Sequence, residues 1–251
     1  MSTIAVIAVI GGTGLNDYPG LQIRASKPVR TPYGAPSAPL IHGRVHGVEV
    51  VFLPRHGVGH TLPPHKINYR ANLWALHKAG IRKVIAIAAV GGIARSFPPA
   101  AVAVPHDLVD YTWGREHSYS DGSSQSVQHA DFSEPYSPTV RRVLLAAATS
   151  AKVKVVRRGV MGVTQGPRLE SPAEIQRLKR DGCTMVGMTG MPETALAREL
   201  GLEYASLAVS VNWAAGLGSG DIHGEIEACI ASGMAKVRAI LAEALPLLAR
   251  D

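Results

Sequence analysis

The sequence is poor in cysteine, and its apolar runs are short. Its two cysteines, Cys183 and Cys229, are too few for a disulfide framework and lack metal-site spacing, so we expect a reducing, cytoplasmic setting and no bound metal. The longest apolar runs have the length of strands, far below the ~20 residues that span a bilayer. The first residues lack the basic start and the cleavage pattern of a signal peptide. We therefore expect neither a membrane protein nor a secreted one.

Aromatic residues are also scarce, at 5% of the chain, although the formal net charge is +7. Nucleic-acid binding usually needs basic residues gathered on one surface. Here they are scattered, and Arg141-Arg142 and Arg157-Arg158 are separated by apolar sequence. We expect no nucleic-acid partner, because attraction of an anionic small substrate accounts for the charge equally well.

Apolar strand-like runs alternate with helical patterns along the chain. The 251 residues are 46% hydrophobic, which is enough for one large core and predicts a single α/β domain over residues 1–251. Strands are expected near residues 4–10, 48–53, 83–89, 101–104, 157–164, 184–188 and 203–211. Helices are expected near residues 67–79, 138–150, 172–181, 191–200 and 224–248. Ser171-Pro172-Ala173-Glu174 predicts a capping box, and residues 110–136 predict a long functional loop.

Gly11-Gly12-Thr13-Gly14 follows the first apolar run and predicts part of an oxyanion site. The backbone N–H groups of such a glycine turn can face an anion, and the Thr13 hydroxyl adds a donor. Asp17 stands where a dinucleotide fingerprint needs its third glycine, so that motif is not met. A plain turn after a strand is the alternative for this segment.

Two further motifs suit the same anion. Arg55-His56-Gly57 follows the strand near residues 48–53. The Arg fork suits phosphate, and the His can donate or titrate near neutral pH. Thr189 opens a helix with Pro192 and Glu193 in its first turn, where the helix dipole favours an anion.

Five separated motifs, in order, carry a family resemblance. They are Gly11-Gly12-Thr13-Gly14, Arg55-His56-Gly57, Asn68-Tyr69-Arg70-Ala71-Asn72, Gly166-Pro167-Arg168-Leu169-Glu170, and Gly187-Met188-Thr189 continuing to Pro192-Glu193. Together they resemble the trimeric nucleoside phosphorylases over about residues 10–237, in the methylthioadenosine phosphorylase branch and most of all its bacterial S-methyl-5'-thioinosine phosphorylases. The resemblance implies a single-domain α/β sandwich with a mixed central β-sheet flanked by helices.

The resemblance also implies phosphorolysis, in which inorganic phosphate attacks C1' of a purine nucleoside and releases the base. Phosphate is then a co-substrate, and no metal or organic cofactor is implied. By position, phosphate would be held by Thr13, Arg55, His56, Thr189 and the backbone near Ala89. Met188 would pack against the ribose, and His56 and Asn212 would be the catalytic residues.

The base-recognition positions favour a 6-oxopurine. Asn212 stands where relatives that cleave aminopurines have an Asp, and an Asn amide can donate to a 6-oxo group. Ala214 replaces a second acidic residue of those relatives, and Leu169 replaces an aromatic that stacks on the base. Glu170 matches the Glu that accepts the N1 proton in 6-oxopurine phosphorylases. A residue that complements a helix dipole is the alternative for Glu170.

Recognition of the 5' end depends on two histidines. His129 matches the His that reaches a neighbouring subunit's methylthio pocket, which implies a homotrimer; a plain subunit contact is its alternative. His223 stands where methylthio enzymes have an apolar residue and where inosine and guanosine phosphorylases have a His on the 5'-hydroxyl. A water-facing residue at a helix start is the alternative for His223.

The expected substrate is a 5'-methylthio purine nucleoside, with methylthioinosine favoured over methylthioadenosine. A 6-oxopurine (inosine or guanosine) nucleoside phosphorylase is the alternative activity. A nucleoside hydrolase is disfavoured because Arg55, His56 and Thr189 would then have no phosphate to hold. Ala88 stands where many relatives have Thr or Asn on the phosphate, which weakens affinity by ~1 kcal/mol and keeps a non-catalytic nucleoside-binding protein as a third hypothesis.

Overall fold

The computed structural model describes residues 7–11, 20–120, 122, 127, 129–218 and 226–250. Its strands are β1 (Ile7–Gly11), β2 (Gln22–Lys27), β3 (Leu40–Val45), β4 (Val48–Pro54), β5 (Lys83–Gly92), β6 (Val102–Ala103), β7 (Asp107–Asp110), β8 (Val155–Val156), β9 (Val160–Val163), β10 (Met185–Gly187) and β11 (Glu203–Trp213). Its helices are the 3₁₀ turn η1 (Pro64–Lys66) and α1 (Tyr69–Lys78), α2 (Pro138–Ser150), α3 (Pro172–Arg180), α4 (Gly190–Glu199) and α5 (Ile226–Leu248).

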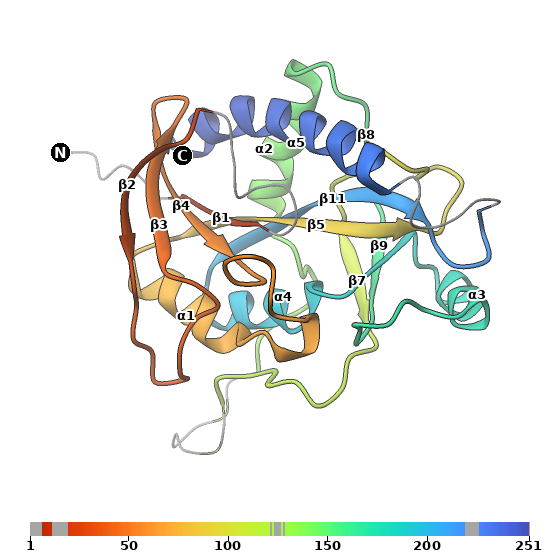
Figure 1. Cartoon of the computed structure of the whole chain (residues 1–251), viewed down its shortest axis with the longest axis horizontal. Coiled ribbons are helices and arrows are strands. Elements are labelled where there is room, and N and C mark those ends of the chain that lie inside the picture. Colours follow the sequence, from red (N-terminus) through yellow and green to blue (C-terminus); the bar gives the residue numbers. More distant parts are fainter. Residues whose placement is uncertain are drawn as a thin grey trace.

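The strands form one mixed sheet in which β5 and β11 run side by side through the middle of the molecule (Figure 1). The main path is β2-β3-β4-β1-β5-β10-β9-β7, and β11 joins the other edge of β5 and carries β6 and β8. The pairs β1–β4, β1–β5 and β5–β11 are parallel, whereas β2–β3, β3–β4, β5–β10 and β6–β11 are antiparallel. The predicted mixed sheet is therefore confirmed.

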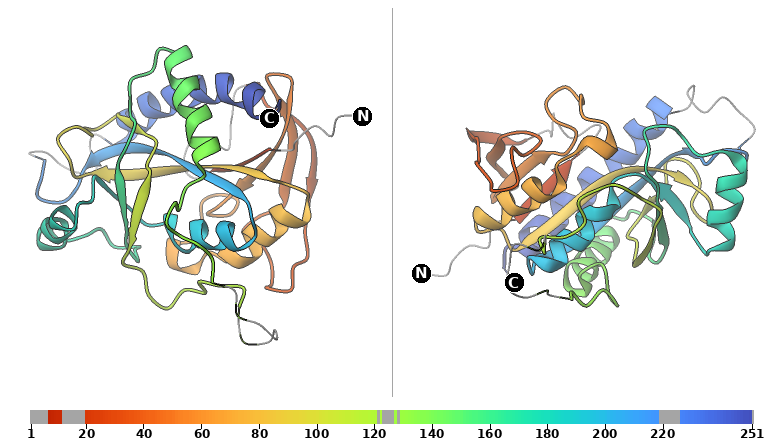
Figure 2. Two further views of the ribbon diagram at one scale, coloured as in Figure 1. Left: turned by 180° about the vertical axis from the view of Figure 1, so that it is seen from behind. Right: turned by 90° about the horizontal axis from the view of Figure 1, so that it is seen from below.

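Two layers of helices cover the sheet, with α2 and α5 on one side and α1 and α4 on the other (Figures 1 and 2). Strand residues alternate between the two cores, as the pleat of a strand requires. Ile7 and Val9 of β1 lie in a cluster with α2 and α5, whereas Ala8 and Ile10 lie in a cluster with α1 and α4. Both faces of β1 are buried, which explains its unbroken apolar sequence.

A gap in the strand pairing along β5 positions the functional site. On one edge, β5 pairs with β1 over Lys83–Ala86 and with β10 at Gly91 and Gly92. Among the described residues, the intervening segment 87–90 has no strand partner on that edge. The backbone groups that face this edge are therefore available to partners other than strands, and the Ile87 carbonyl accepts from Arg55. Ala89 is exposed in an otherwise largely buried strand.

The helix ends agree well with the sequence. Helix α2 begins at Pro138 behind the N-cap Ser137, and α3 begins at Pro172 with both bonds of the predicted Ser171–Glu174 capping box. The strand expected at 157–164 is present as the shorter β9, and the separate strand β8, which precedes that range, was not expected. The expectation also omitted β2, β3 and β7, of which β2 is a largely exposed edge strand of polar sequence.

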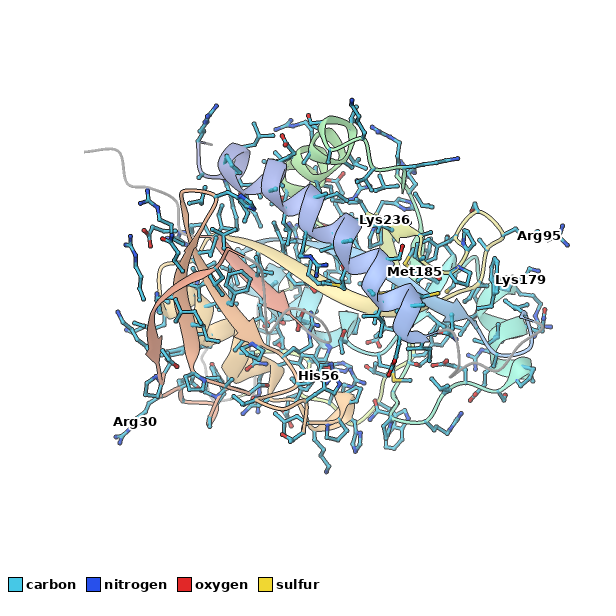
Figure 3. The ribbon with its side chains drawn as sticks, turned by 45° about the horizontal axis from the view of Figure 1, so that its top comes forward. Arg30, His56, Arg95, Lys179, Met185 and Lys236 are labelled. Atoms are coloured by element: carbon cyan, nitrogen blue, oxygen red, sulfur yellow. The ribbon has the colours of Figure 1, made fainter. Side chains whose placement is uncertain are left out.

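Basic side chains project from separate parts of the surface. Arg30 lies beside the β2–β3 end of the molecule, whereas Arg95 and Lys179 extend from the opposite end (Figure 3). This distribution matches the scattered basic residues of the sequence. No helix in the described residues has the length and apolar character needed to cross a membrane.

Candidate active site

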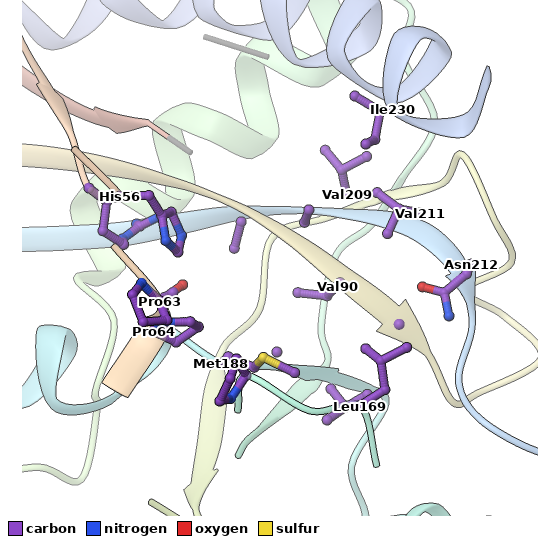
Figure 4. Close-up of a pocket in the computed structure, with 18 of the residues that line it drawn as sticks. His56, Pro63, Pro64, Val90, Leu169, Met188, Val209, Val211, Asn212 and Ile230 are labelled. Carbon is purple, nitrogen blue, oxygen red and sulfur yellow. The ribbon is translucent and has the colours of Figure 1, made fainter. Parts of the chain in front are cut away.

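A cavity of about 510 Å³ opens beside the unpaired segment of β5 (Figure 4). Its walls come from the ends of β4, β5, β10 and β11, the loops that follow them, the loop before α3, and α5. Ligands in sheets of this kind collect outside the carboxyl ends of the parallel strands. In Figure 4, His56 and Asn212 lie at opposite ends of the cavity, and Met188 and Leu169 lie along one wall between them.

The His56 end brings together most of the residues predicted to hold phosphate. Arg55, His56, Ala89 and Thr189 all line this cavity, although they come from three different parts of the chain. The exposed Ala89 brings the unpaired backbone of β5 to the cavity wall. Thr189 is only 9% exposed, and its hydroxyl makes no capping bond to α4. The hydroxyl is therefore available to a ligand.

The start of α4 is irregular. Thr189 is the N-cap, but Met191 has φ −121° and ψ 139°, which are not helical, and the Met191–Pro192 peptide bond is cis. Regular helix therefore begins only at Pro192. The prediction that Thr189 sits at a helix N-terminus is confirmed, because Thr189 is the N-cap of α4, although the chain runs extended at Met191 before the regular helix starts.

Arg55 is held by the buried carboxylate of Glu193. From the sequence, Glu193 was identified only as a residue in the first turn of a helix. The Arg55 Nε and Nη2 donate to the two oxygens of Glu193 at 2.6 and 2.8 Å, and Nη1 donates to the Ile87 carbonyl at 3.0 Å. Burial opposes the charge of Arg55, but attraction and hydrogen bonding by Glu193 raise its pKa overall. Two of the five guanidinium N–H groups remain for another partner.

His56 is fixed by its backbone surroundings. Its Nδ1 lies 2.8 Å from the Leu62 carbonyl, and its ring stacks on that of His60 with centroids 4.2 Å apart. A carbonyl only accepts, so Nδ1 carries the proton and Nε2 is an acceptor in the neutral ring. Burial lowers the pKa of His56 to about 4. Of the two options that the sequence left open for His56, donation or titration near neutral pH, the lowered pKa disfavours titration.

The pKa of His56 gives a test of stability against pH. The unfolded state, with the ordinary His pKa of about 6.5, takes up this proton at higher pH than the folded state. Stability therefore falls as the pH drops from about 6.5 to about 4. Thermal unfolding of H56Q across this range should show a shallower loss of Tm than wild type. The exposed His46, in the turn between β3 and β4, supplies the control H46Q, and an equal slope in wild type and H56Q would contradict the prediction.

The far end of the cavity contains the predicted base-recognition residues. Leu169, Glu170, Asn212 and Ala214 all line it. Asn212 Nδ2 donates to the Trp213 carbonyl at 2.6 Å, which fixes the plane of the amide. Glu170 accepts a hydrogen bond from the Thr164 hydroxyl. This end of the cavity therefore presents oriented polar groups, and Leu169 is 47% exposed beside them.

The wall beside α5 is apolar, and the sequence reading did not identify it. Val209 and Val211 of β11 and Ile230 and Met234 of α5 line the cavity there. In Figure 4, Ile230, Val209 and Val211 lie across the cavity from Met188 and Leu169. The signal in the sequence was the period of α5, which places residues 230 and 234 on one face. An apolar substituent of a ligand would be buried favourably against this wall.

Arg115, in the predicted functional loop, does not line the cavity but hydrogen-bonds to two segments that form its walls. Its guanidinium donates to the carbonyls of Thr164, Gln165, Met188 and Met191. It thereby joins the loop that leads to Glu170 to the segment that contains Met188. No local motif marks this role, because its partners lie about 50 to 76 residues away along the chain.

Replacing Arg115 by Met should lower the free energy of unfolding by about 2–4 kcal/mol, because several carbonyls lose their donor. The Michaelis constant for the nucleoside should also rise, because the hydrogen bonds that join the two walls of the cavity are lost. Arg141 offers a matched control, since it donates to the Val104, Pro105 and Arg157 carbonyls away from the cavity. Urea unfolding should show that R141M loses stability, and kinetics should show that its Michaelis constant for the nucleoside is unchanged. An unchanged Michaelis constant in R115M would contradict the role of Arg115 at the cavity.

Three predicted residues are not placed at the cavity. Thr13 and His223 lie outside the described residues. His129 is exposed and does not line the cavity of the single chain, so its role across a subunit contact stays a prediction. The described residues contain no group of three or more His, Cys, Asp and Glu side chains that could hold a metal ion.

The fold is α/β, and its cavity has donors suited to a small anion at the His56 end and polar groups suited to an organic ligand at the Asn212 end. The family model of the phosphorylase superfamily matches residues 6–246. The chain is 54% identical over 243 residues to a probable S-methyl-5'-thioinosine phosphorylase of Pseudomonas syringae pv. tomato, covering 96% of this chain and 99% of the relative. It is 41% identical to a probable 6-oxopurine nucleoside phosphorylase of Moorella thermoacetica, covering 98% of this chain and 94% of the relative.

The fold also matches solved structures of enzymes over nearly the whole chain. Methylthioadenosine phosphorylase from Schistosoma mansoni in complex with adenine has a TM-score of 0.91 and 32% sequence identity, covering 98% of this chain and 93% of that chain. The chain therefore belongs to the phosphorylase superfamily. The predicted family, the predicted α/β fold and the predicted class of enzyme, a phosphate-dependent pentosyltransferase, are confirmed.

Proposed function

We propose that this protein cleaves the N-glycosidic bond of a 5'-methylthio purine nucleoside with phosphate, with methylthioinosine as its preferred substrate. The observation that carries the proposal is the cavity itself. One end holds Arg55, His56 and Thr189, and the other holds Asn212 and Glu170. A nucleoside lying between them would have its base at the Asn212 end and C1' toward the anion. The relatives named S-methyl-5'-thioinosine phosphorylases support the same substrate.

The reaction balances with hydrogen phosphate as the nucleophile. A phosphate oxygen forms a bond to C1' as the C1'–N9 bond breaks, and the electron pair of that bond leaves with the purine. The proton of hydrogen phosphate is transferred to the purine, which gives the neutral base and 5-methylthioribose 1-phosphate. The acceptor Nε2 of neutral His56 suits the O–H of such a phosphate, and Ala89, Thr189 and Arg55 supply donors.

The polar and apolar walls support the choice of nucleoside. Asn212 and Glu170 are assigned to a 6-oxo group and the N1 proton, and Met188 to the ribose. The wall of Val209, Val211, Ile230 and Met234 favours a methylthio group over a hydroxyl. A 6-oxopurine phosphorylase acting on inosine or guanosine is the second candidate, which the relatives of that name favour.

We assign no metal or organic cofactor to the reaction, and we propose a homotrimer in the cytoplasm in which His129 reaches the site of a neighbouring subunit. Light scattering of the purified protein would test the trimer. An H129A variant that stays trimeric but loses preference for the methylthio substrate would support its role. A fully active monomer would contradict it.

Initial rates with and without phosphate on methylthioinosine, methylthioadenosine, inosine and adenosine test the function. The proposal expects phosphate-dependent cleavage that is fastest with methylthioinosine. Preference for inosine would favour the second candidate, and preference for methylthioadenosine would overturn the base assignment. Cleavage that does not need phosphate would identify a hydrolase instead.

A further inference from the structure

Glu193 lies behind the phosphate end of the cavity and has no contact with the cavity itself. It belongs to α4, is 0% exposed and does not line the cavity. Its two carboxylate oxygens accept from Arg55 at 2.6 and 2.8 Å, and one of them also accepts from the Tyr204 hydroxyl at 2.7 Å. Among the cavity-lining residues, Glu193 hydrogen-bonds to Arg55, so its effect on the geometry of a bound ligand acts through Arg55.

A buried ion pair of this kind is weak evidence for stability. Desolvating both charges costs about as much as their attraction returns, and apolar replacements of such pairs are often neutral. Arg55 is 2% exposed, yet it lines the cavity, so its position matters for a ligand. The pairing with Glu193 fixes the plane of the guanidinium and leaves two N–H groups for that ligand.

The charges around the cavity give Glu193 a second effect. Among the described lining residues, Arg55 is the one Arg or Lys side chain, and Glu193 cancels its charge. His56 and His60 also lie at this end, and burial keeps His56 neutral near pH 7. Arg115 lies behind Met188 and donates to backbone carbonyls. An anion at this end is therefore bound mainly by oriented N–H and O–H dipoles, because little net positive charge remains there.

We propose that Glu193 is a positioning residue that orients Arg55 and cancels its charge, so that the negative charge of bound phosphate is balanced mainly by the cation developing at C1'. The inference rests on the proposed phosphorolysis, and it adds that C1'–N9 cleavage runs ahead of bond formation to phosphate, as in other glycosidic cleavages, so that positive charge develops at C1'. A cradle without net charge holds phosphate less tightly in the ground state. The bound phosphate is then stabilised more strongly when the ribosyl cation forms. Because this extra stabilisation is present only in the transition state, it raises kcat.

The test separates charge from geometry with two variants. E193Q keeps the shape of the side chain and removes its charge, which leaves Arg55 as a net cation. Because the Gln amide nitrogen cannot accept, E193Q also removes one of the two Arg55 hydrogen bonds to this side chain. The inference expects phosphate to bind about 10-fold more tightly, with kcat lowered roughly 10-fold or more. Y204F is the matched control, because it removes one hydrogen bond from the same carboxylate and keeps both charges. It should hold phosphate within about 3-fold of wild type.

Calorimetry with inorganic phosphate and steady-state kinetics would measure these effects, with circular dichroism to check folding. Weaker phosphate binding by E193Q with unchanged kcat would show that Glu193 is only a scaffold for Arg55. If E193Q does not fold, a 10-fold loss of phosphate affinity in Y204F would likewise overturn the charge role. If wild type cleaves no nucleoside with phosphate, the proposed function fails, whereas phosphate calorimetry still decides whether Glu193 cancels the charge.

Discussion

Replacing Arg55 by Lys is expected to lower kcat/KM for phosphorolysis by roughly 100-fold, the order found when a preorganised donor is lost from a catalytic site. Most of the loss should be in the KM for phosphate. Lys keeps the charge opposite Glu193, but a single ammonium cannot bond both Glu193 oxygens and the Ile87 carbonyl while it still faces the cavity. The substitution therefore removes the fork and preserves the charge.

Surface arginines provide the control for this substitution. Arg95 is exposed and projects away from the molecule (Figure 3), so R95K should leave both kinetic constants unchanged. Thermal unfolding should show that R55K is folded. A KM for phosphate within 2-fold of wild type would show that charge alone suffices at position 55.

Local sequence patterns predicted the elements of the fold well where one physical signal dominates. The apolar run before Gly11, the N-caps Ser137 and Ser171, and the period of α5 all act over a few residues. The edge strand β2 lacks such a signal, because four of its six residues are polar, almost all are exposed, and its order comes from backbone pairing with β3. Strands of this kind are predicted from their partners rather than from their own sequence.

The candidate site was predicted in the same uneven way. Arg55, Glu170 and Thr189 lie in motifs, and Asn212 was assigned from its place at the end of a strand; all four line one cavity. Glu193 and Arg115 were not assigned to the site, because each acts through residues distant in the chain. Arg55 and Glu193 are 138 positions apart, and only the folded sheet shows that they pair.

Asn212 should decide which purine leaves. In N212D the amide donor is replaced by a carboxylate that can only accept, which opposes a 6-oxo group and suits a 6-amino group. We expect kcat/KM for methylthioinosine to fall by about 100-fold or more relative to that for methylthioadenosine, because a buried polar mismatch discriminates strongly. Rates on the two nucleosides at saturating phosphate would measure the ratio.

The variant N212A separates the new charge from the loss of the Asn212 bond to the Trp213 carbonyl. It loses that bond as N212D does, but it introduces no carboxylate. Both substrates should slow in N212A, and the methylthioadenosine rate should gain no advantage approaching that in N212D.

Adding E170Q to N212D should move the preference further toward methylthioadenosine, because a Gln can donate to N1 of an aminopurine. E174Q is the matched control, since Glu174 pairs with Arg168 at the surface. An unchanged substrate ratio in N212D would place the base elsewhere in the cavity, away from the end that Asn212 and Glu170 form.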